Sequence, residues 1–254
     1  MEHMLTAAEQ DYLKNIYTLQ CESGRATTQA LADRLGVRAA SVTAMIKRLA
    51  EDTGGPYLTH TPYHGAALTD RGRAVALEML RHHRLLELYL AEHLGVPWDQ
   101  VHAEAERLEH VISEDLEERI AAKLGQPTRD PHGDPIPSRE GVMDEADGVP
   151  LTGLRVGTRA VVSRVPDGDP ALLQYLGTLG LVPGAAVVVA EVAPYGDVLQ
   201  VRIGTAAQAA AVGGTIARRV LARPAERQDT PGGTPKAPGE ASGGGVREPE
   251  TATR

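Results

Sequence analysis

The chain has 254 residues, 42% of them hydrophobic, and a formal net charge of −8, so it can form one large domain or two to three small ones, each with its own core. The lone cysteine, Cys21, excludes an intramolecular disulfide and a cysteine-based zinc site, and it fits a reducing compartment. Residues 1–6 lack the features of a secretory signal, and no segment approaches the roughly 20 apolar residues of a membrane span. We therefore expect a cytoplasmic protein with no membrane partner.

Residues 1–73 predict a helix-turn-helix followed by a hairpin. A capping-box pattern at Thr6 and Glu9 opens a first helix, and a second helix begins at Thr28 and stops at Gly36. A third helix follows after a short turn and carries on one face the apolar residues Val42, Ile46 and Leu49. This order and spacing are typical of a DNA-binding helix-turn-helix.

The third helix and the hairpin are the predicted DNA-contacting parts. Residues 57–60 and 66–68 flank a turn that contains a glycine, which predicts a wing. The outer face of the third helix carries small or hydrogen-bonding side chains, which let a helix lie deep in a major groove. Residues 25–73 contain seven basic and four acidic residues, and this local balance favours DNA over an ordinary helical mini-domain with a hairpin. The candidate DNA contacts are Thr28, Gln29, Arg38, Ala40, Ser41, Thr43, Lys47, Arg48 and His64.

Residues 70–124 read as two long helices, broken at residues 95–97, that carry candidate metal ligands. On the first, His83 and Glu87 stand four residues apart and can chelate one ion. On the second, a single stripe carries His102, Glu106, Glu109 and His110. Imidazole and carboxylate groups without thiolate suit Mn(II), Fe(II), Co(II) or Zn(II). The same residues at helical spacing also occur on solvated helix faces, so the spacing alone leaves both interpretations open.

The amino-acid composition of the second half of the chain changes twice, after residue 150 and after Pro224. Residues 126–150 are rich in proline, glycine and aspartate and predict a loop, whereas residues 151–224 are dense in valine and glycine and predict short strands. The tail after Pro224 is dominated by glycine, proline, glutamate and threonine. Such a composition cannot bury enough apolar surface to order itself, so we expect disorder there.

The run HHRLLE at residues 82–87, the motif EHVIS at 109–113 and DPHGDPIP at 130–137 resemble the diphtheria toxin repressor family of metal-dependent regulators, and in particular its manganese-responsive branch. The resemblance covers about residues 4–224. It implies a mainly α fold with a winged helix-turn-helix (1–73), a helical metal-binding and dimerisation domain (74–140), a linker (141–150), a C-terminal SH3-like β-barrel (151–224) and a tail (225–254).

The resemblance also implies two metal sites. An ancillary site corresponds to His83, Glu87 and His102, and a primary site corresponds to Asp11, Glu106, Glu109 and His110. Asp167 and Asp169 are further candidates, because the C-terminal domain completes the ancillary site in longer members. Iron-responsive members carry Met and Cys where this chain has Asp11 and Glu106, so the hard carboxylates favour Mn(II), with Fe(II), Zn(II) or Co(II) as alternatives. Lys14 departs from the binuclear subtype, which has a glutamate at that position.

The implied mechanism is a homodimer whose bound metal fixes the spacing of two recognition helices on an operator in double-stranded DNA. The resemblance thus implies a repressor of manganese and iron homeostasis genes. We expect the dimer contacts to come from the apolar positions Val111, Leu116 and Ile120. The alternatives are a metalloenzyme that uses a metal-bound water and a metal-independent winged-helix regulator. The sequence offers no additional positioned nucleophile or acid–base pair, so we expect no enzyme.

Overall fold

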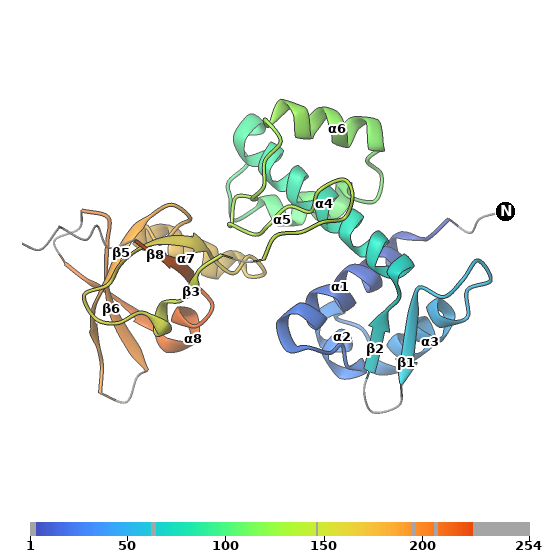
Figure 1. The fold of residues 1–254 in the computed structure, drawn as a ribbon, viewed down its shortest axis with the longest axis horizontal. Coiled ribbons are helices and arrows are strands. Elements are labelled where there is room, and N and C mark those ends of the chain that lie inside the picture. Colours follow the sequence, from blue (N-terminus) through green and yellow to red (C-terminus); the bar gives the residue numbers. More distant parts are fainter. Residues whose placement is uncertain (1–3, 62–64, 146, 195–196, 206–207, 226–254) are drawn as a thin grey trace, which may run out of the picture.

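The computed structural model describes residues 4–61, 65–145, 147–194, 197–205 and 208–225. Figure 1 shows three parts: the N-terminal helices with their hairpin, a helical part around α4, and a C-terminal β-barrel. The predicted fold class is confirmed by this arrangement. No helix within the described ranges is long and apolar enough to cross a membrane. His64 lies outside the described residues, as does the expected disordered tail apart from Ala225.

The N-terminal domain has the predicted winged helix-turn-helix architecture. Its elements are α1 (Ala7–Ser23), α2 (Thr28–Leu35), α3 (Ala39–Ala50), β1 (Leu58–Thr61) and β2 (Gly65–Leu68). The capping box is present, because the Thr6 side chain accepts from the main-chain N–H of Glu9 and the Glu9 carboxylate accepts from that of Thr6. Gly36 ends α2 with φ of 65°, a conformation that glycine adopts without strain. The predicted apolar residues Val42, Ile46 and Leu49 are buried.

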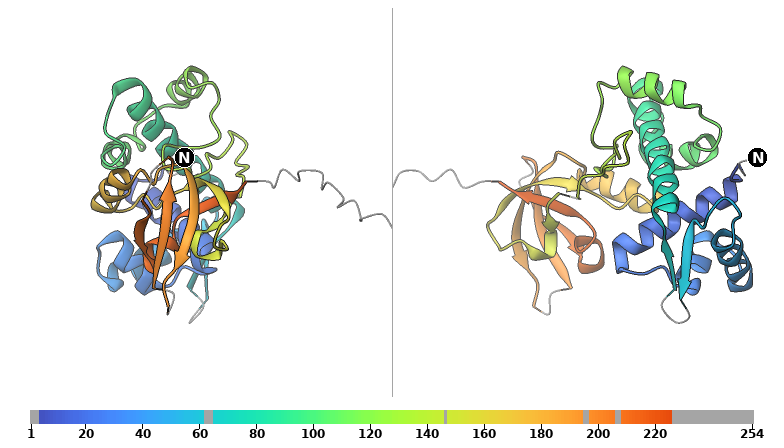
Figure 2. Two further views of the ribbon diagram at one scale, coloured as in Figure 1. Left: turned by 90° about the vertical axis from the view of Figure 1, so that its left-hand side faces the viewer. Right: turned by 45° about the vertical axis from the view of Figure 1, so that its right-hand side comes forward.

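A long helix, α4 (Asp70–Leu94), connects the DNA-binding domain to the helical part. Figure 2 shows it from two further sides as a rod that runs from the N-terminal helices to α6. Its first turn packs so closely on the hairpin that a side chain at Gly72 would place its Cβ 1.9 Å from the main-chain oxygen of Tyr57. Gly72 therefore sets the distance between α4 and the wing.

We expect Gly72→Ala to lower the free energy of unfolding by about 3 kcal/mol, because the added methyl group must push backbone away from backbone. Gly213→Ala is the matched control, since no atom lies within 4 Å of a Cβ at that position. Urea unfolding of both variants measures the difference. Equal stabilities of the two variants would contradict the close contact.

The prediction of a second long helix is wrong, because two shorter helices form there, α5 (Val101–Leu108) and α6 (Glu114–Lys123). Ser113 starts α6 by accepting a hydrogen bond from the main-chain N–H of Leu116. Acidic residues in the first turn of α6 stabilise the new N-terminus through the helix dipole. Glu109 and His110 therefore lie beyond the end of α5 rather than on one helical stripe with His102.

The C-terminal barrel is a six-stranded sheet in the order β3-β8-β4-β5-β6-β7, with antiparallel neighbours. Its elements are β3 (Val149–Pro150), a 3-10 turn (Leu151–Gly153), β4 (Arg159–Arg164), α7 (Pro170–Leu179), β5 (Ala186–Val192), β6 (Val198–Ile203), β7 (Ala210–Gly213), α8 (Gly214–Ala217) and β8 (Leu221–Pro224). Alternate strand residues point inward and build a core of valine, leucine and alanine.

A buried loop joins the barrel to the helical part. Within it, Asp130, His132 and Asp134 are all at most 5% exposed. The main-chain oxygen of His132 accepts from the N–H of Val165 at 2.9 Å, and Asp134 pairs with Arg164 at 2.8 Å. These contacts hold the end of β4 against the loop.

Candidate metal centre and DNA-binding surface

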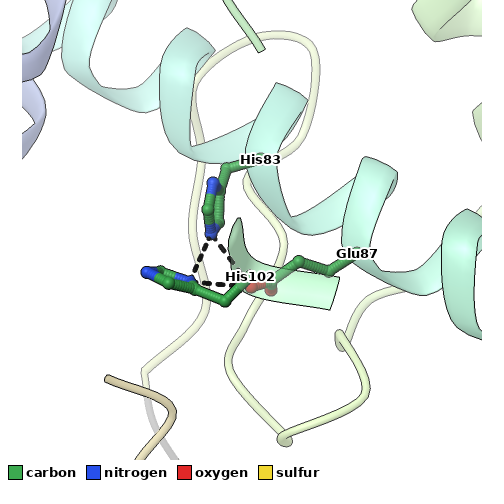
Figure 3. Close-up of side chains that lie close together, drawn as sticks. All are labelled: His83, Glu87 and His102. Carbon is green, nitrogen blue, oxygen red and sulfur yellow. Dashed lines mark hydrogen bonds and ion pairs between the residues drawn. The ribbon is translucent and has the colours of Figure 1, made fainter. Parts of the chain in front are cut away.

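The structure brings His83 and Glu87 of α4 together with His102 of α5 (Figure 3). His83 Nε2 lies 2.9 Å from Glu87 Oε1 and 2.9 Å from His102 Nδ1, and the last two atoms are 3.0 Å apart. The four-residue spacing on α4 aligns the first two side chains, and the packing of α5 on α4 supplies the third. Three ligand-type atoms thus form a nearly equilateral triangle.

This triangle fits a divalent cation. Two ligands at right angles, each bonded at about 2.1 Å, stand about 3.0 Å apart, so the three atoms match one face of an octahedron. Two imidazoles and one carboxylate suit Mn(II), Fe(II), Co(II) or Zn(II). The residues present therefore fit the metal that the sequence predicts.

The pKa values of the groups in and beside the triangle are strongly shifted. The hydrogen bonds of His102 to Glu106 and Glu87 raise the pKa of His102 to about 10, and the bond from His102 lowers the pKa of Glu106 to about 2. Burial acts to raise the pKa of Glu87, but the neighbouring His83 and His102 outweigh it and hold that pKa well below its usual value. Without a metal, shared protons hold these groups together.

A second group forms where α1 meets the end of α5. His110 Nε2 lies 3.1 Å from Asp11 Oδ1 and 3.5 Å from Glu109 Oε1. The other ring nitrogen, Nδ1, donates to the side-chain oxygen of Gln10 at 2.8 Å, so Nε2 is the ring atom that faces the carboxylates. Gln10 was not predicted from the sequence, because it acts on a residue 100 positions away.

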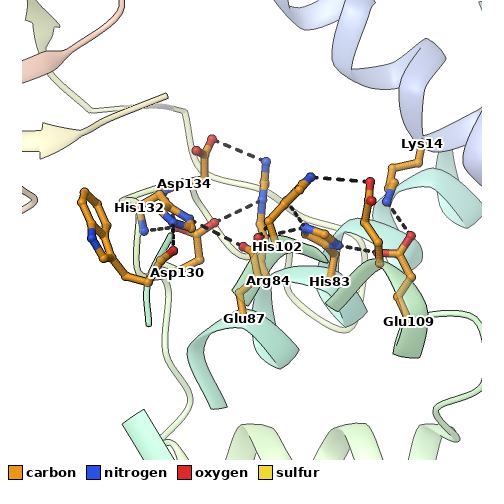
Figure 4. A network of polar contacts seen from close by, with 11 residues as sticks. Lys14, His83, Arg84, Glu87, His102, Glu109, Asp130, His132 and Asp134 are labelled. Atoms are coloured by element: carbon orange, nitrogen blue, oxygen red, sulfur yellow. Dashed lines mark hydrogen bonds and ion pairs between the residues drawn. The ribbon is translucent and has the colours of Figure 1, made fainter. Parts of the chain in front are cut away.

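Glu109 lies between the two groups. Its Oε2 atom accepts from His83 Nδ1 at 2.5 Å, and its Oε1 atom accepts from the Lys14 ammonium group. Figure 4 shows the charged side chains as one continuous row, from Asp130 and His132 at one end to Glu109 and Lys14 at the other. Glu109 orients His83 so that its Nε2 atom faces Glu87 and His102.

The remaining candidates lie in different places. Glu106 is not brought to Asp11, Glu109 and His110; its carboxylate lies 3.5 Å from His102 Nε2 and is half exposed. Asp167 lies near Glu87 and His132, whereas Asp169 caps the N-terminus of α7 by accepting from the main-chain N–H groups of Ala171 and Leu172.

The predicted DNA-contacting residues form an exposed face on α3. Ala40, Ser41, Thr43 and Lys47 are exposed, as is the preceding Arg38. On α2, Gln29 is exposed and donates to Asp33, and Thr28 is half buried at the first turn. Arg48 has another contact, because its Nε atom lies 2.9 Å from the buried carboxylate of Glu9. Arg48 thereby connects α3 to α1.

The apolar residues expected at the dimer contact separate into two kinds. Val111 and Leu116 are 77% and 49% exposed, but Ile120 is 6% exposed and packs within the helical core. The expectation of an Ile120 contact is therefore wrong. Leu108 is also exposed and lies in the same region of the chain.

Comparisons with known proteins cover all three parts of the fold. Residues 4–66 match the iron dependent repressor N-terminal DNA binding domain, residues 69–138 the iron dependent repressor metal binding and dimerisation domain, and residues 149–224 the FeoA domain. The chain is 38% identical over 199 residues to the iron-dependent repressor IdeR of Mycobacterium tuberculosis (strain ATCC 25618 / H37Rv), covering 74% of this chain and 85% of that protein. It is 34% identical over 145 residues to the diphtheria toxin repressor of Corynebacterium efficiens, covering 57% and 61%.

Solved structures agree with these matches. A manganese-dependent transcriptional repressor in complex with manganese is similar with a TM-score of 0.77 at 39% identity, over 85% of this chain and 100% of that one. The manganese regulator SloR gives a TM-score of 0.71 at 28% identity, over 87% and 100%. The chain therefore belongs to the iron-dependent repressor family of the diphtheria toxin repressor, whose members are metal-dependent transcriptional repressors and not enzymes.

Proposed function

We propose that this chain is a cytoplasmic, Mn(II)-responsive repressor that binds operator DNA as a homodimer. The observation that carries the proposal is the group Asp11, Glu109 and His110, which joins α1 of the DNA-binding domain to the end of α5 through ligand-type atoms. Its donors are two carboxylates and one imidazole, without sulfur. Hard donors of this kind suit Mn(II).

A chain of contacts connects this group to the DNA-binding face. Asp11 lies on α1, and the buried Glu9 on the same helix pairs with Arg48 of α3. A metal ion would supply the positive charge that holds Asp11, Glu109 and His110 together. Movement of α1 toward α5 would carry α3 with it, so the position of the recognition helix depends on how firmly α1 is held. Such a metal must bind the DNA-competent arrangement more tightly than the others.

A homodimer follows from the exposed apolar residues Leu108, Val111 and Leu116 near the start of α6. A surface of this kind is typical of an interface between subunits. Two copies related by a twofold axis would present two α3 helices to a palindromic operator.

An Fe(II)- or Zn(II)-responsive repressor is the second candidate. The group His83, Glu87 and His102 favours it, because two imidazoles and a carboxylate accept these metals as readily as Mn(II). Some relatives are named as iron-dependent repressors and others as manganese-dependent ones.

The experiment that tests the proposal is fluorescence anisotropy on DNA from the promoter of a manganese transporter, with Mn(II), Fe(II), Zn(II) or a chelator. We expect Mn(II) to increase affinity by about 5- to 150-fold, the range of typical allosteric coupling. Lys47→Ala is the control, since this exposed residue of α3 should weaken DNA binding without changing Mn(II) affinity. Binding that no metal changes would overturn the proposal.

Metal binding should also release protons. The pKa of His102 is raised to about 10, and a ligand must be deprotonated, so at neutral pH the metal displaces a proton from this group. We expect the apparent Mn(II) affinity of the His83, Glu87 and His102 group to rise with pH between 6 and 9, by up to about tenfold per unit for each proton released. Calorimetry in buffers of different ionisation enthalpy counts these protons, and no buffer dependence would contradict the prediction.

A further inference from the structure

A cluster of ligand-type atoms that belongs to neither group above lies between α4 and the start of α6. It consists of Glu78 and His82 of α4 and Glu114 of α6, and one ligand atom from each lies within 4.8 Å of the other two. Glu78 and His82 stand four residues apart, so their side chains share one face of α4. We infer that these three residues bind a divalent cation, which fastens the start of α6 to α4.

The hydrogen bonding of His82 determines which ring nitrogen faces the cluster. Its Nδ1 atom lies 3.1 Å from the main-chain oxygen of Glu109, which can only accept, so Nδ1 donates there. Nε2 is then the ring atom that faces the carboxylates, and it lies 3.9 Å from Glu114 Oε1. The His82 side chain is only 5% exposed, so the protein shields this atom from bulk water.

The buried Nε2 atom of His82 has no hydrogen-bond partner within the described part of the chain. Glu117 Oε2 lies 3.0 Å from it as an ion-pair contact, but out of line for a hydrogen bond. A buried polar atom without a partner is costly. A cation between Nε2 and the carboxylates of Glu78 and Glu114 would remove that cost.

The two glutamates concentrate negative charge beside the ring. Partial burial raises the pKa of Glu78, and the carboxylate of Glu114 raises it further against the opposing effect of His82. Glu78 and Glu114 also share a side-chain hydrogen bond, which requires that one of the two carboxylates holds a proton. A divalent cation can take the place of that proton and attract both carboxylates.

The basic side chains of this region do not supply the missing charge. Arg81 pairs with Glu117 through its Nε atom and donates to the main-chain oxygen of Pro137 at 2.9 Å. Among the described residues, no arginine or lysine forms an ion pair with Glu78 or Glu114. The charge of these two carboxylates is therefore open to an ion from solution.

The donor set and its exposure indicate which ion fits and how tightly. One imidazole with two carboxylates suits a borderline divalent ion such as Mn(II) or Zn(II). Glu78 and Glu114 are exposed and line a cavity of about 560 Å³, so an ion can reach them directly. Because two of the three ligands must be ordered on binding, we expect a lower affinity here than at His83, Glu87 and His102. The site shares no ligand with the Asp11 group, so it does not rest on the proposed function.

The test is a titration of metal-free protein with Mn(II), in which electron paramagnetic resonance measures the free ion and thereby the number bound per chain. Wild type is compared with Glu78→Gln, Glu114→Gln and the control Asp115→Asn, which removes an exposed carboxylate from the same turn of α6. We expect Glu78→Gln and Glu114→Gln each to bind about one Mn(II) fewer per chain at saturation, while Asp115→Asn matches wild type. All three changes are at exposed positions, and circular dichroism confirms that each variant folds.

Equal numbers of bound Mn(II) in all four proteins would overturn the site. A matching loss in Asp115→Asn would also overturn it, because the effect would then come from general negative charge at the start of α6. Mn(II)-promoted DNA binding is measured on the same preparations. If it persists while the numbers are equal, this site alone fails; if wild type binds no Mn(II), the proposed function fails as well.

Discussion

Asp11→Ala should leave DNA binding by this chain almost insensitive to Mn(II), a loss of the about 5- to 150-fold response expected of the wild type. Asp11 is the ligand-type side chain that α1 contributes to the group with Glu109 and His110. Without Asp11, a metal bound by Glu109 and His110 has no carboxylate ligand from the DNA-binding domain. Anisotropy with and without Mn(II) measures the response.

The fold should survive this change, because the Asp11 side chain is 37% exposed and its pairing with His110 is close to solvent. Glu22→Ala is a matched control: it removes an equally charged, exposed side chain from the same helix, where Glu22 pairs with Arg34. The control should keep the Mn(II) response. A full response in Asp11→Ala would instead assign sensing to the His83, Glu87 and His102 group.

Local patterns were enough to predict most of the fold. Apolar spacing and the capping box at Thr6 and Glu9 located the N-terminal helices, because these signals act within a few residues. The break between α5 and α6 was missed, since apolar spacing continues from Val101 to Leu116 through the turn. Ser113 followed by acidic residues was the available signal for a new helix start.

The candidate site was less accessible to the same reasoning. His83 and Glu87 stand on one helix, so their spacing alone predicts a shared ligand face. Asp11 was predicted as a ligand only from the family resemblance, because no residue near it in the sequence indicates a contact with residues about a hundred positions later. His132 has no local signal in the sequence, because its contacts with Glu87 and Trp98 come from the tertiary structure.

Glu109→Gln should have the largest effect on stability, and we expect it to lower the free energy of unfolding by about 3–5 kcal/mol in the absence of metal. Glu109 is buried, and it accepts from Lys14 with one oxygen and from His83 with the other. The amide removes the charge that both partners face, so the buried Lys14 loses the carboxylate that pairs with it directly. Because Glu109 also orients His83, Mn(II) affinity should fall at both groups.

The pH dependence of this loss has a definite sign. Burial acts to raise the pKa of Glu109, but His83 and Lys14 outweigh it and lower that pKa below its usual 4.5. A lowered folded-state pKa stabilises the protein above 4.5, and this contribution disappears as pH falls through the folded-state value. The difference between wild type and Glu109→Gln should therefore be full near pH 7 and shrink below about pH 4.

The matched control for Glu109→Gln is Glu104→Gln on α5, where an exposed carboxylate pairs with the exposed Arg107. Its effect should stay within about 0.5 kcal/mol, since surface pairs contribute little. Adding Lys14→Met to Glu109→Gln should recover part of the loss, because the stranded charge is then gone. If the two changes lower the free energy of unfolding additively, Lys14 and Glu109 do not act as a pair. Mn(II) affinity at the group of His83, Glu87 and His102 would then test whether Glu109 orients His83.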